Sequence, residues 1–397
     1  MEPTSPWQPA DWVNRGGALL AQDPRLAQRL ISQGLRGIPE EPVAWFNLGI
    51  ALHQQRRIDA AIRAYQMALQ HPGAPQAAVR NNLSQDLLLN GCFQEGWDFY
   101  DYRLQTPKHD NRYFEQLDGP PWQGLDDPRP CRRLVLVAEQ GFGDTLQFSR
   151  LALLLQQRGI ATVLFCQPAL VPLLQEGTGL QQVCSNVPGD LFDGSTRWCP
   201  LLSLPQRLQL HHHNIPFAEG YLKPDPQRVG QWHGRLNRQP GHRLIALHWQ
   251  GNPKHEGSLY SRGRSMALDH WRPLAEVPGI ELVSIQKGAG SEQLEQHHDL
   301  PLVAGQAAVS SSLDFRDTTA VLANCDLLIS ADSGVVHLAG AMGLPTWVAL
   351  RWIPEWRWLL QGQHSAWYQS LRLFRQPHDG DWASVVAAMG QALRETL

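Results

Sequence analysis

The chain has 397 residues, a formal net charge of −3 and an apolar content of 43%. These values describe an ordinary folded protein that is long enough for two or three domains. They give no support for bulk binding to nucleic acid or to an anionic membrane.

The cysteines and the N-terminal residues give an indication of the cellular compartment. The six cysteines form no CxxC pair, which favours thiols in a reducing environment over disulfides or zinc ligands. The N-terminal residues lack the basic and apolar regions of a signal peptide, and no apolar run is long enough to span a membrane. We therefore expect a cytoplasmic protein with no membrane span.

Residues 1–108 have the pattern of helical repeats. The middle of this region follows tetratricopeptide (TPR) spacing, with Trp45, Leu48, Gly49, Leu52, Ala61, Tyr65, Ala68 and Pro72. Looser equivalents lie one period later, at Leu83, Leu87, Gly96 and Tyr100, and one period earlier, at Trp12, Gly16 and Leu19. About three repeats are predicted, in which Trp45, Leu48 and Leu52 face the second helix and small Gly49 and Ala61 let the helices approach. Such a stack is a surface for binding rather than for catalysis.

Residues 109–240 predict a first Rossmann-like half, entered through a Pro- and Gly-rich connector at 105–132 in which Pro121 and Trp122 form an anchor. A strand at 134–138, a glycine-rich turn at 139–144 and a helix at 145–158 open it. The turn lacks the third glycine of GxGxxG, because Leu146 holds that position, and it lacks the end of a P-loop. Asp144 is either a helix cap or a carboxylate available as a general base, and spacing alone favours the cap.

Further segments continue this half. They are strands at 162–166 and 181–185, a helix from Pro168 and the apolar segment 199–205. His211, His212 and His213 follow in a loop, but adjacent histidines cannot all face one metal ion and no partner motif accompanies them. We expect no metal site.

Residues 241–397 predict the second half. Its first strand, 244–249, leads into the loop 250–265, which carries Lys254, His255, Arg262 and Arg264 among Gly, Ser and Asn. Four cations in one such loop favour phosphate binding as much as simple solvation. The next segments are a helix at 267–277, a strand at 281–286 that ends beside Lys287, a helix at 318–324, a strand at 371–375 and a helix at 382–393.

The stretch 327–350 is the most informative. It predicts a strand at 327–330, a polar turn at 331–334, a helix at 335–342 and a strand at 346–350. Ligands bind at such turns because the helix N-terminus carries unpaired N–H groups and partial positive charge. Asp332 and Ser333 also suit a helix cap, whereas a cap does not explain His337 one turn further on.

Four segments carry a resemblance to a known family: EQGFGDTLQFSR, WQGNPKH with RGRS, SIQKG, and ISADSGVVHLAGAMGLPTWVAL. Together with the repeats, they resemble bacterial tetratricopeptide-repeat proteins with a heptosyltransferase-type (family nine) GT-B glycosyltransferase domain. The resemblance covers essentially the whole chain. It implies a multi-domain fold, with α-helical TPR repeats followed by two Rossmann-like domains of the GT-B type. The C-terminal one, 241–397, would bind the nucleotide sugar.

The resemblance also implies roles for individual residues. The proposed catalytic base falls on Asp144, and the acceptor-side turn on Gly141, Gly143 and Gln147. The ligands of the donor diphosphate fall on Asp332, Ser333, Gly334, His337, Lys254, Arg262 and Arg264. The nucleotide base would lie beside Gln286 and Lys287. The composition of the loop from Glu256 to Tyr260 departs from the family pattern, which weakens the assignment of the phosphate ligands there.

The reaction implied is an inverting transfer from a nucleoside-diphosphate sugar to a hydroxyl, with no metal and no further cofactor. The repeats would recruit a protein, peptide or glycan acceptor, or another partner. The main alternative is a non-catalytic TPR scaffold with a degenerate GT-B module. A dehydrogenase is disfavoured by the missing glycine and by the lack of a ribose-binding acid after the strand at 162–166.

Overall fold

The structure is a computed structural model that describes residues 7–107, 114, 117–186, 191–257 and 260–396. The chain forms two compact units. The helical unit contains the residues before 112 together with Ile353–Leu360, and the α/β unit contains the remainder. The sequence did not indicate that a segment so late in the chain belongs with the helices.

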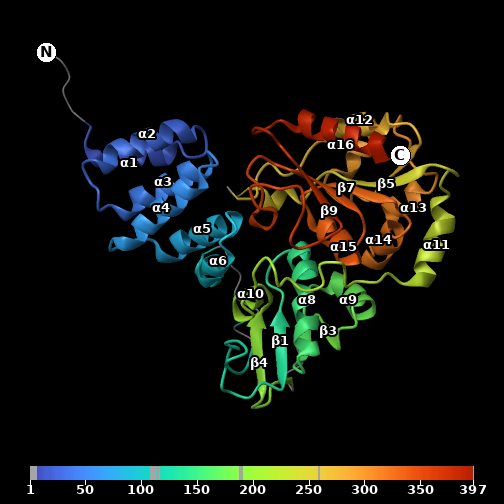
Figure 1. The fold of residues 1–397 in the computed structure, drawn as a ribbon, viewed down its shortest axis with the longest axis horizontal. Coiled ribbons are helices and arrows are strands. Elements are labelled where there is room, and N and C mark those ends of the chain that lie inside the picture. Colours follow the sequence, from blue (N-terminus) through green and yellow to red (C-terminus); the bar gives the residue numbers. More distant parts are fainter. Residues whose placement is uncertain (1–6, 108–113, 115–116, 187–190, 258–259, 397) are drawn as a thin grey trace. The chain divides into compact units, whose positions relative to one another are not determined.

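The helical unit consists of helical hairpins, drawn in blue in Figure 1. The hairpins are α1 (Pro9–Ala18) with α2 (Pro24–Leu35), α3 (Pro42–His53) with α4 (Ile58–Gln70), and α5 (Gln76–Leu89) with α6 (Phe93–Tyr100). Three of these helices begin at a proline, whose missing N–H and fixed φ suit the first helical position.

Small residues set the spacing within each hairpin, as the sequence predicted. A Cβ on Gly49 would lie 2.3 Å from the Tyr65 ring, and one on Gly96 would lie 2.7 Å from Leu88. Leu48 and Leu52 are buried as expected. Trp45 is only half-buried, because its indole N–H reaches the carbonyl of Pro39 at 2.7 Å instead of lying fully against the second helix.

The late segment packs on the last hairpin through aromatic rings. The Trp356 ring meets the Trp97 ring edge-on at 5.2 Å and the Tyr100 ring at 5.9 Å. Arg56 donates to the carbonyl of Leu360 at 2.8 Å. The helical unit is therefore completed by residues 353–360, which follow a strand of the other unit.

The α/β unit holds two parallel sheets. The first has the order β3-β2-β1-β4, and its strands are β1 (Arg133–Val137), β2 (Ala161–Phe165), β3 (Gln182–Cys184) and β4 (Thr196–Pro200). The second has the order β6-β5-β7-β8-β9, and its strands are β5 (Arg243–His248), β6 (Ile280–Ser284), β7 (Leu327–Ala331), β8 (Thr346–Leu350) and β9 (Leu371–Arg375). Every residue of β6, β7 and β8 is buried, as in sheets covered on both faces.

Helices connect and cover these strands (Figure 1). They are α8 (Phe142–Gln157), α9 (Val171–Gly177), α10 (Leu204–Arg207), α11 (Pro226–Leu236), α12 (Arg272–Ala275), α13 (Gln306–Ser311), α14 (Phe315–Leu322), α15 (Gly334–Met342) and α16 (Trp382–Thr396). The predicted strands agree with the structure to within two residues at most ends. The expected helix at 267–277 was wrong in extent, because a 3-10 turn (Leu268–Trp271) precedes the single turn of α12 around Pro273. Helices α11 and α13 were not predicted.

Each sheet has a point at which the chain order reverses. In the first sheet β2 and β4 lie on opposite sides of β1, and in the second β6 and β7 lie on opposite sides of β5. Crevices outside the carboxyl ends of strands at such points are where open α/β sheets bind ligands. They direct attention to the loops after β1, β5 and β7.

Candidate active site

Two helix N-termini meet where these loops lie. Helix α8 follows β1 and helix α15 follows β7, and the two pack side by side. A Cβ on Gly143 would lie 2.9 Å from Cδ2 of His337 and 3.1 Å from Cα of Gly334. The two glycines thus permit direct backbone contact between the halves. Of the predicted site residues, the structure brings Gly143, Gly334 and His337 together.

The start of α15 is not capped by its own serine. Ser333 holds the N-cap position, but its side chain makes no capping hydrogen bond. The Ser333 hydroxyl lies 3.1 Å from Nδ1 of His248, at the end of β5. Burial lowers the pKa of His248 to about 4, so the imidazole is neutral near pH 7. The Val336 N–H donates to the carbonyl of Ser333 at 3.1 Å, and the N–H groups of Gly334 and Val335 have no acceptor among the described residues, which is what an anion site requires.

Asp332 stands beside this helix start and is 6% exposed. Within the described part of the chain its carboxylate accepts no hydrogen bond. Neither carboxylate oxygen is among the side-chain atoms that are sealed from solvent without a partner, so the carboxylate is open to water or to a bound molecule with hydroxyl donors. A carboxylate accepts hydrogen bonds and repels phosphate, which makes direct contact with a diphosphate unfavourable.

His337 is also buried, with 7% of its surface exposed. Its Nδ1 lies 3.1 Å from the hydroxyl of Tyr368, in the segment before β9. The opposite edge of the imidazole faces Gly143. The imidazole is therefore held between the C-terminal half and the turn of the N-terminal half.

The turn before α8 is capped, in contrast to that before α15. The helix begins at Phe142 rather than 145, which places Asp144 in its first turn. The Asp144 carboxylate accepts from the N–H of Gly141 at 3.0 Å. The cap that spacing favoured is present, and a carboxylate with several lone pairs can serve as a cap and as a base at once. Gln147 is fully buried and does not face an open acceptor surface.

The cationic loop after β5 lies next to the β7–α15 turn, because β5 and β7 are hydrogen-bonded neighbours. Lys254 is exposed, and its ammonium group has no partner among the described residues. Arg264 lies 3.6 Å from the Glu256 carboxylate. Arg262 is exposed, and its carbonyl accepts from Arg351 at 2.8 Å. Lys254 is thus the cation of this loop best placed to meet an anion.

Gln286 and Lys287 have other partners than a nucleotide base. Gln286 is 2% exposed; its side-chain oxygen accepts from the N–H groups of Trp249 and Gln250 at 3.1 Å, and its amide donates to two carbonyls. Lys287 donates to the carbonyl of Val309, and burial lowers its pKa to about 8. Gln286 shapes the loop after β5 and has no group left to read a base.

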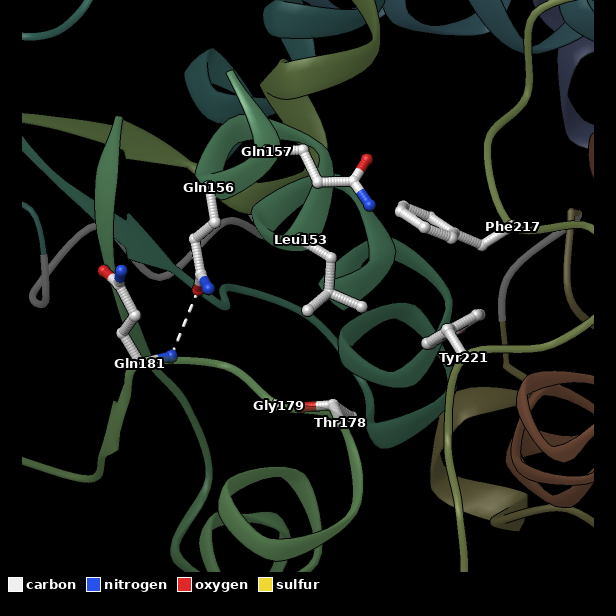
Figure 2. Close-up of a pocket in the computed structure, with 8 residues that line it drawn as sticks. All are labelled: Leu153, Gln156, Gln157, Thr178, Gly179, Gln181, Phe217 and Tyr221. Atoms are coloured by element: carbon white, nitrogen blue, oxygen red, sulfur yellow. Dashed lines mark hydrogen bonds between the residues drawn. The ribbon is translucent and has the colours of Figure 1, made fainter. Parts of the chain in front are cut away.

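A separate pocket of about 450 Å³ lies at the far end of α8 (Figure 2). Gln156, Gln157, Phe217 and Tyr221 are among its lining residues. Because α8 rises about 1.5 Å per residue, the lining residues on this helix, from Leu153 onward, lie about 15 Å or more along it from Gly143. It is not the crevice that the topology marks.

The remaining findings concern metals, thiols and membranes. No group of three or more His, Cys, Asp or Glu side chains that could hold a metal ion occurs within the described ranges. All six cysteines are free thiols, with three buried and three partly buried. Across the described residues, none of the helices combines the length and apolar character that a membrane crossing demands.

Two family models match parts of the chain. A tetratricopeptide-repeat model matches residues 42–71. The model of glycosyltransferase family 9 (heptosyltransferase) matches residues 279–350, which include β7, α15 and β8. A TPR model thus matches part of the helical unit, and the family 9 model matches part of the second sheet with its helices. The predicted order of helical repeats followed by two α/β halves is confirmed.

Individual relatives are more distant. The chain is 26% identical over 385 residues to protein FlbA of Caulobacter vibrioides; the match covers 91% of this chain and only 63% of the length of FlbA. The structure of the family 9 glycosyltransferase of Veillonella parvula is 11% identical, with a TM-score of 0.44, and 67% of this chain and 90% of that one are covered. For E. coli ADP-heptose lps heptosyltransferase II the identity is 13%, the TM-score is 0.41 and the coverage is 67% and 100%.

Sequence reasoning missed three buried residues near the helix junction. His248, Tyr368 and Arg150 come from separate parts of the chain, and their contacts with the site depend on tertiary packing. Only His248 left a signal, as a histidine at the end of the apolar run LIALH just before a loop that had already been selected.

Proposed function

We propose that this protein transfers a sugar from a nucleoside-diphosphate sugar to a hydroxyl acceptor, with inversion and without a metal ion. The observation that carries the proposal is the uncapped start of α15 at the chain reversal of the second sheet, held against the turn before α8 by Gly143 and Gly334. Donor and acceptor would meet in the crevice between these two helix starts.

The donor diphosphate would lie at the first N–H groups of α15. As the bond to the sugar breaks, the leaving group gains negative charge, and fixed N–H donors stabilise that charge without reorganisation. Lys254, in the adjoining loop, would supply a cation. Asp332 would accept hydroxyl groups of the donor, because its carboxylate is unsuited to phosphate contact.

Asp144 would act as the general base toward the acceptor hydroxyl. Its position at the start of α8 is fixed by the hydrogen bond from Gly141, so the carboxylate has a defined direction. Proton transfer by a positioned carboxylate contributes about 10²- to 10⁴-fold in rate. Gly141, at which a Cβ would meet only the Asp144 carboxylate, would leave space for the acceptor beside it.

The TPR repeats would recruit the acceptor, which we propose to be a protein, a peptide or a glycan, or another partner. Stacked helical repeats present extended surfaces for such binding. The six free thiols agree with a reducing compartment such as the cytoplasm.

A second candidate is a TPR scaffold whose GT-B module no longer catalyses. The observation in its favour is that Asp144 caps α8. This structural role alone would explain an aspartate at this position, without any catalysis. Asp332 favours the enzyme, since its carboxylate serves no hydrogen bond within the described residues and a purely structural module has no use for it.

The test is the thermal stability of the full chain with ADP, UDP, GDP, CMP or NAD, each with and without EDTA. A ligand at a hundred times its dissociation constant stabilises the native state by about 2.7 kcal/mol. We expect a shift with one nucleoside diphosphate that is indifferent to EDTA and is reduced in Lys254→Met. A shift that EDTA abolishes would contradict metal independence, and no shift with any nucleotide would favour the scaffold.

A further inference from the structure

The pocket at the far end of α8 plays no part in the proposed transfer (Figure 2). Its volume of about 450 Å³ lies within the range of small-molecule pockets, about 300–1,000 Å³. None of its described lining residues carries a charge. Gln156 and Gln157, which line it, are the last residues of α8, where a helix carries partial negative charge. The pocket therefore suits a neutral ligand and disfavours phosphate.

Three glutamines give the pocket its hydrogen-bonding groups. The side-chain oxygen of Gln156 accepts from the Thr162 hydroxyl at 2.9 Å and from the N–H of Gln181 at 3.1 Å. These two bonds fix the amide and leave its NH₂ group without an acceptor among the described residues. The side chains of Gln157 and Gln181 are exposed and have no described partner either. Amide groups that are open to water can equally bond the hydroxyl groups of a ligand.

An aromatic ring stands opposite the end of α8. Figure 2 shows the side chains of Phe217 and Gln157 directed toward each other. The backbone of Phe217 has a φ of 53°, a left-handed conformation that glycine or asparagine adopts at lower cost. Its carbonyl accepts from the N–H of Gly220 at 3.2 Å, so a turn accounts for the backbone. The turn does not account for the phenyl ring, which is only partly buried and lines the pocket.

The wall beside this ring is held in place from three directions. The Tyr221 hydroxyl donates to the carbonyl of Leu146 at 2.5 Å, and the Tyr221 N–H donates to that of Ala341 at 2.7 Å. The guanidinium carbon of Arg150 lies 4.7 Å from the centre of the Tyr221 ring. The tyrosine wall is thus already formed without a ligand, which lowers the entropic cost of binding.

We propose that this pocket binds a neutral saccharide, with Phe217 against one face of a sugar ring and the three glutamines bonded to its hydroxyl groups. The faces of a sugar ring carry C–H groups, which the negative face of an aromatic ring attracts, and its hydroxyl groups point outward around the edge. The amides suit this shape because they come from two elements, α8 and the segment before β3. The proposal does not depend on the proposed function, since neither the start of α15 nor Asp144 takes part.

The test is saturation-transfer NMR of the full chain with the methyl glycosides of glucose, galactose, mannose and N-acetylglucosamine. We expect transfer to at least one glycoside. Phe217→Gly suits the left-handed backbone, so its melting temperature should not fall, whereas its affinity for the glycoside should fall about tenfold or more with the loss of the apolar contact. Gln157→Ala should weaken binding about two- to tenfold, the contribution of one hydrogen bond. No transfer to any of these glycosides overturns the proposal.

The matched control variant is Phe142→Ala, because Phe142 is an exposed phenylalanine at the opposite end of α8. It should leave the glycoside affinity unchanged. Binding that is lost in Phe142→Ala and kept in Phe217→Gly would place the sugar outside the pocket and overturn the proposal. Adenosine and uridine are the matched ligands, since they are neutral and carry flat aromatic bases. Preference for a nucleoside over every glycoside would also overturn it. No diphosphate enters these measurements, so their outcome is separate from that of the proposed function.

Discussion

The N-termini of α8 and α15, which meet in the α/β unit, follow similar strand–turn–helix segments but differ in their capping. Helix α8 follows β1, the strand at which the chain order of the first sheet reverses, and α15 follows β7, the neighbour of the reversal strand β5 in the second sheet. Both starts contain a glycine that allows the other to approach. Before α8, Asp144 closes the start by accepting from Gly141. Before α15, Ser333 turns away from the helix to His248 and leaves the start open.

This difference separates two tasks at one crevice. A carboxylate at a helix start neutralises its partial charge and excludes an anion, whereas a start that keeps its N–H groups attracts one. The capped turn then suits the acceptor and its base, and the open turn suits the donor diphosphate. Neither turn alone favours an enzyme over a scaffold, whereas the asymmetric pair supports the proposed enzyme.

The largest expected effect comes from Asp144→Asn. The amide oxygen can still accept from Gly141, so we expect the free energy of unfolding to stay within about 0.5 kcal/mol. Transfer should fall at least about 100-fold, because the base is lost. Release of nucleoside diphosphate from the donor measures the rate, and calorimetry should show unchanged nucleotide affinity. An Asn variant with full activity would reduce Asp144 to a cap.

The buried His248 gives the second prediction, which concerns pH. Its pKa is about 4 in the folded chain and 6.5 when unfolded, so between these values the unfolded state binds more protons. Stability is therefore lost as pH falls from 6.5 toward 4, by about 3 kcal/mol at most.

Urea unfolding at several pH values measures this loss, with His248→Asn as the matched variant. The native chain should lose stability toward acid more steeply than the variant, since only the native chain must protonate this imidazole on unfolding. Equal pH dependence in the two chains would show that His248 is not held neutral beside Ser333.

Many of the helices and strands could be predicted from the sequence. The features that could not be predicted depend on contacts between residues far apart in the chain. The strand–turn–helix pattern at 327–350 predicted β7, α15 and β8 closely, since buried strands and glycine stops are local signals. The sequence could not show that the Ser333 hydroxyl bonds His248 instead of capping α15, because His248 lies 85 residues away. The placement of Trp356 in the helical unit could not be predicted either, because the ring that it contacts lies far away in the sequence, in α6.

The same limit of local sequence patterns applies to the predicted site residues. Gln286 was selected because it ends a strand at the ligand edge, a local criterion, yet all its polar groups are used within the loop. Arg150 was never selected, because a buried cation in an apolar helix shows no partner in the sequence.

The third prediction tests the contact between the two helix starts. Gly143→Ala would place a methyl group 2.9 Å from His337 and 3.1 Å from Gly334, so the halves must move apart. We expect a loss of about 1–3 kcal/mol in stability and weaker nucleotide binding. Gly141→Ala is the control, since its Cβ meets only the Asp144 carboxylate, at 3.4 Å. Equal effects at both positions would contradict a specific junction.

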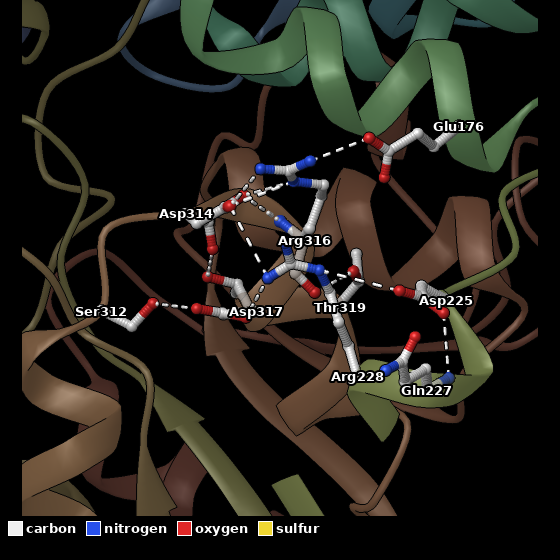
Figure 3. Close-up of polar contacts among 10 residues, drawn as sticks. Glu176, Asp225, Gln227, Arg228, Ser312, Asp314, Arg316, Asp317 and Thr319 are labelled. Atoms are coloured by element: carbon white, nitrogen blue, oxygen red, sulfur yellow. Dashed lines mark hydrogen bonds and ion pairs between the residues drawn. The ribbon is translucent and has the colours of Figure 1, made fainter. Parts of the chain in front are cut away.

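The smallest effect is expected at the rim, where Figure 3 shows a second link between the halves. Arg316 of α14 donates to Glu176 of α9 at 2.8 Å and is also held by Asp314. Glu176 is half exposed, with 52% of its side chain accessible, so solvent and salt screen this pair.

Glu176→Gln should therefore change the free energy of unfolding by no more than about 0.5 kcal/mol, and less in high salt. Arg316→Gln should cost more, because it also removes the bonds to Asp314. Urea unfolding at low and high salt measures both. A loss above about 1.5 kcal/mol in Glu176→Gln would place the connection between the halves at the charged rim. The buried glycine junction would then no longer be what aligns the capped and the open helix start.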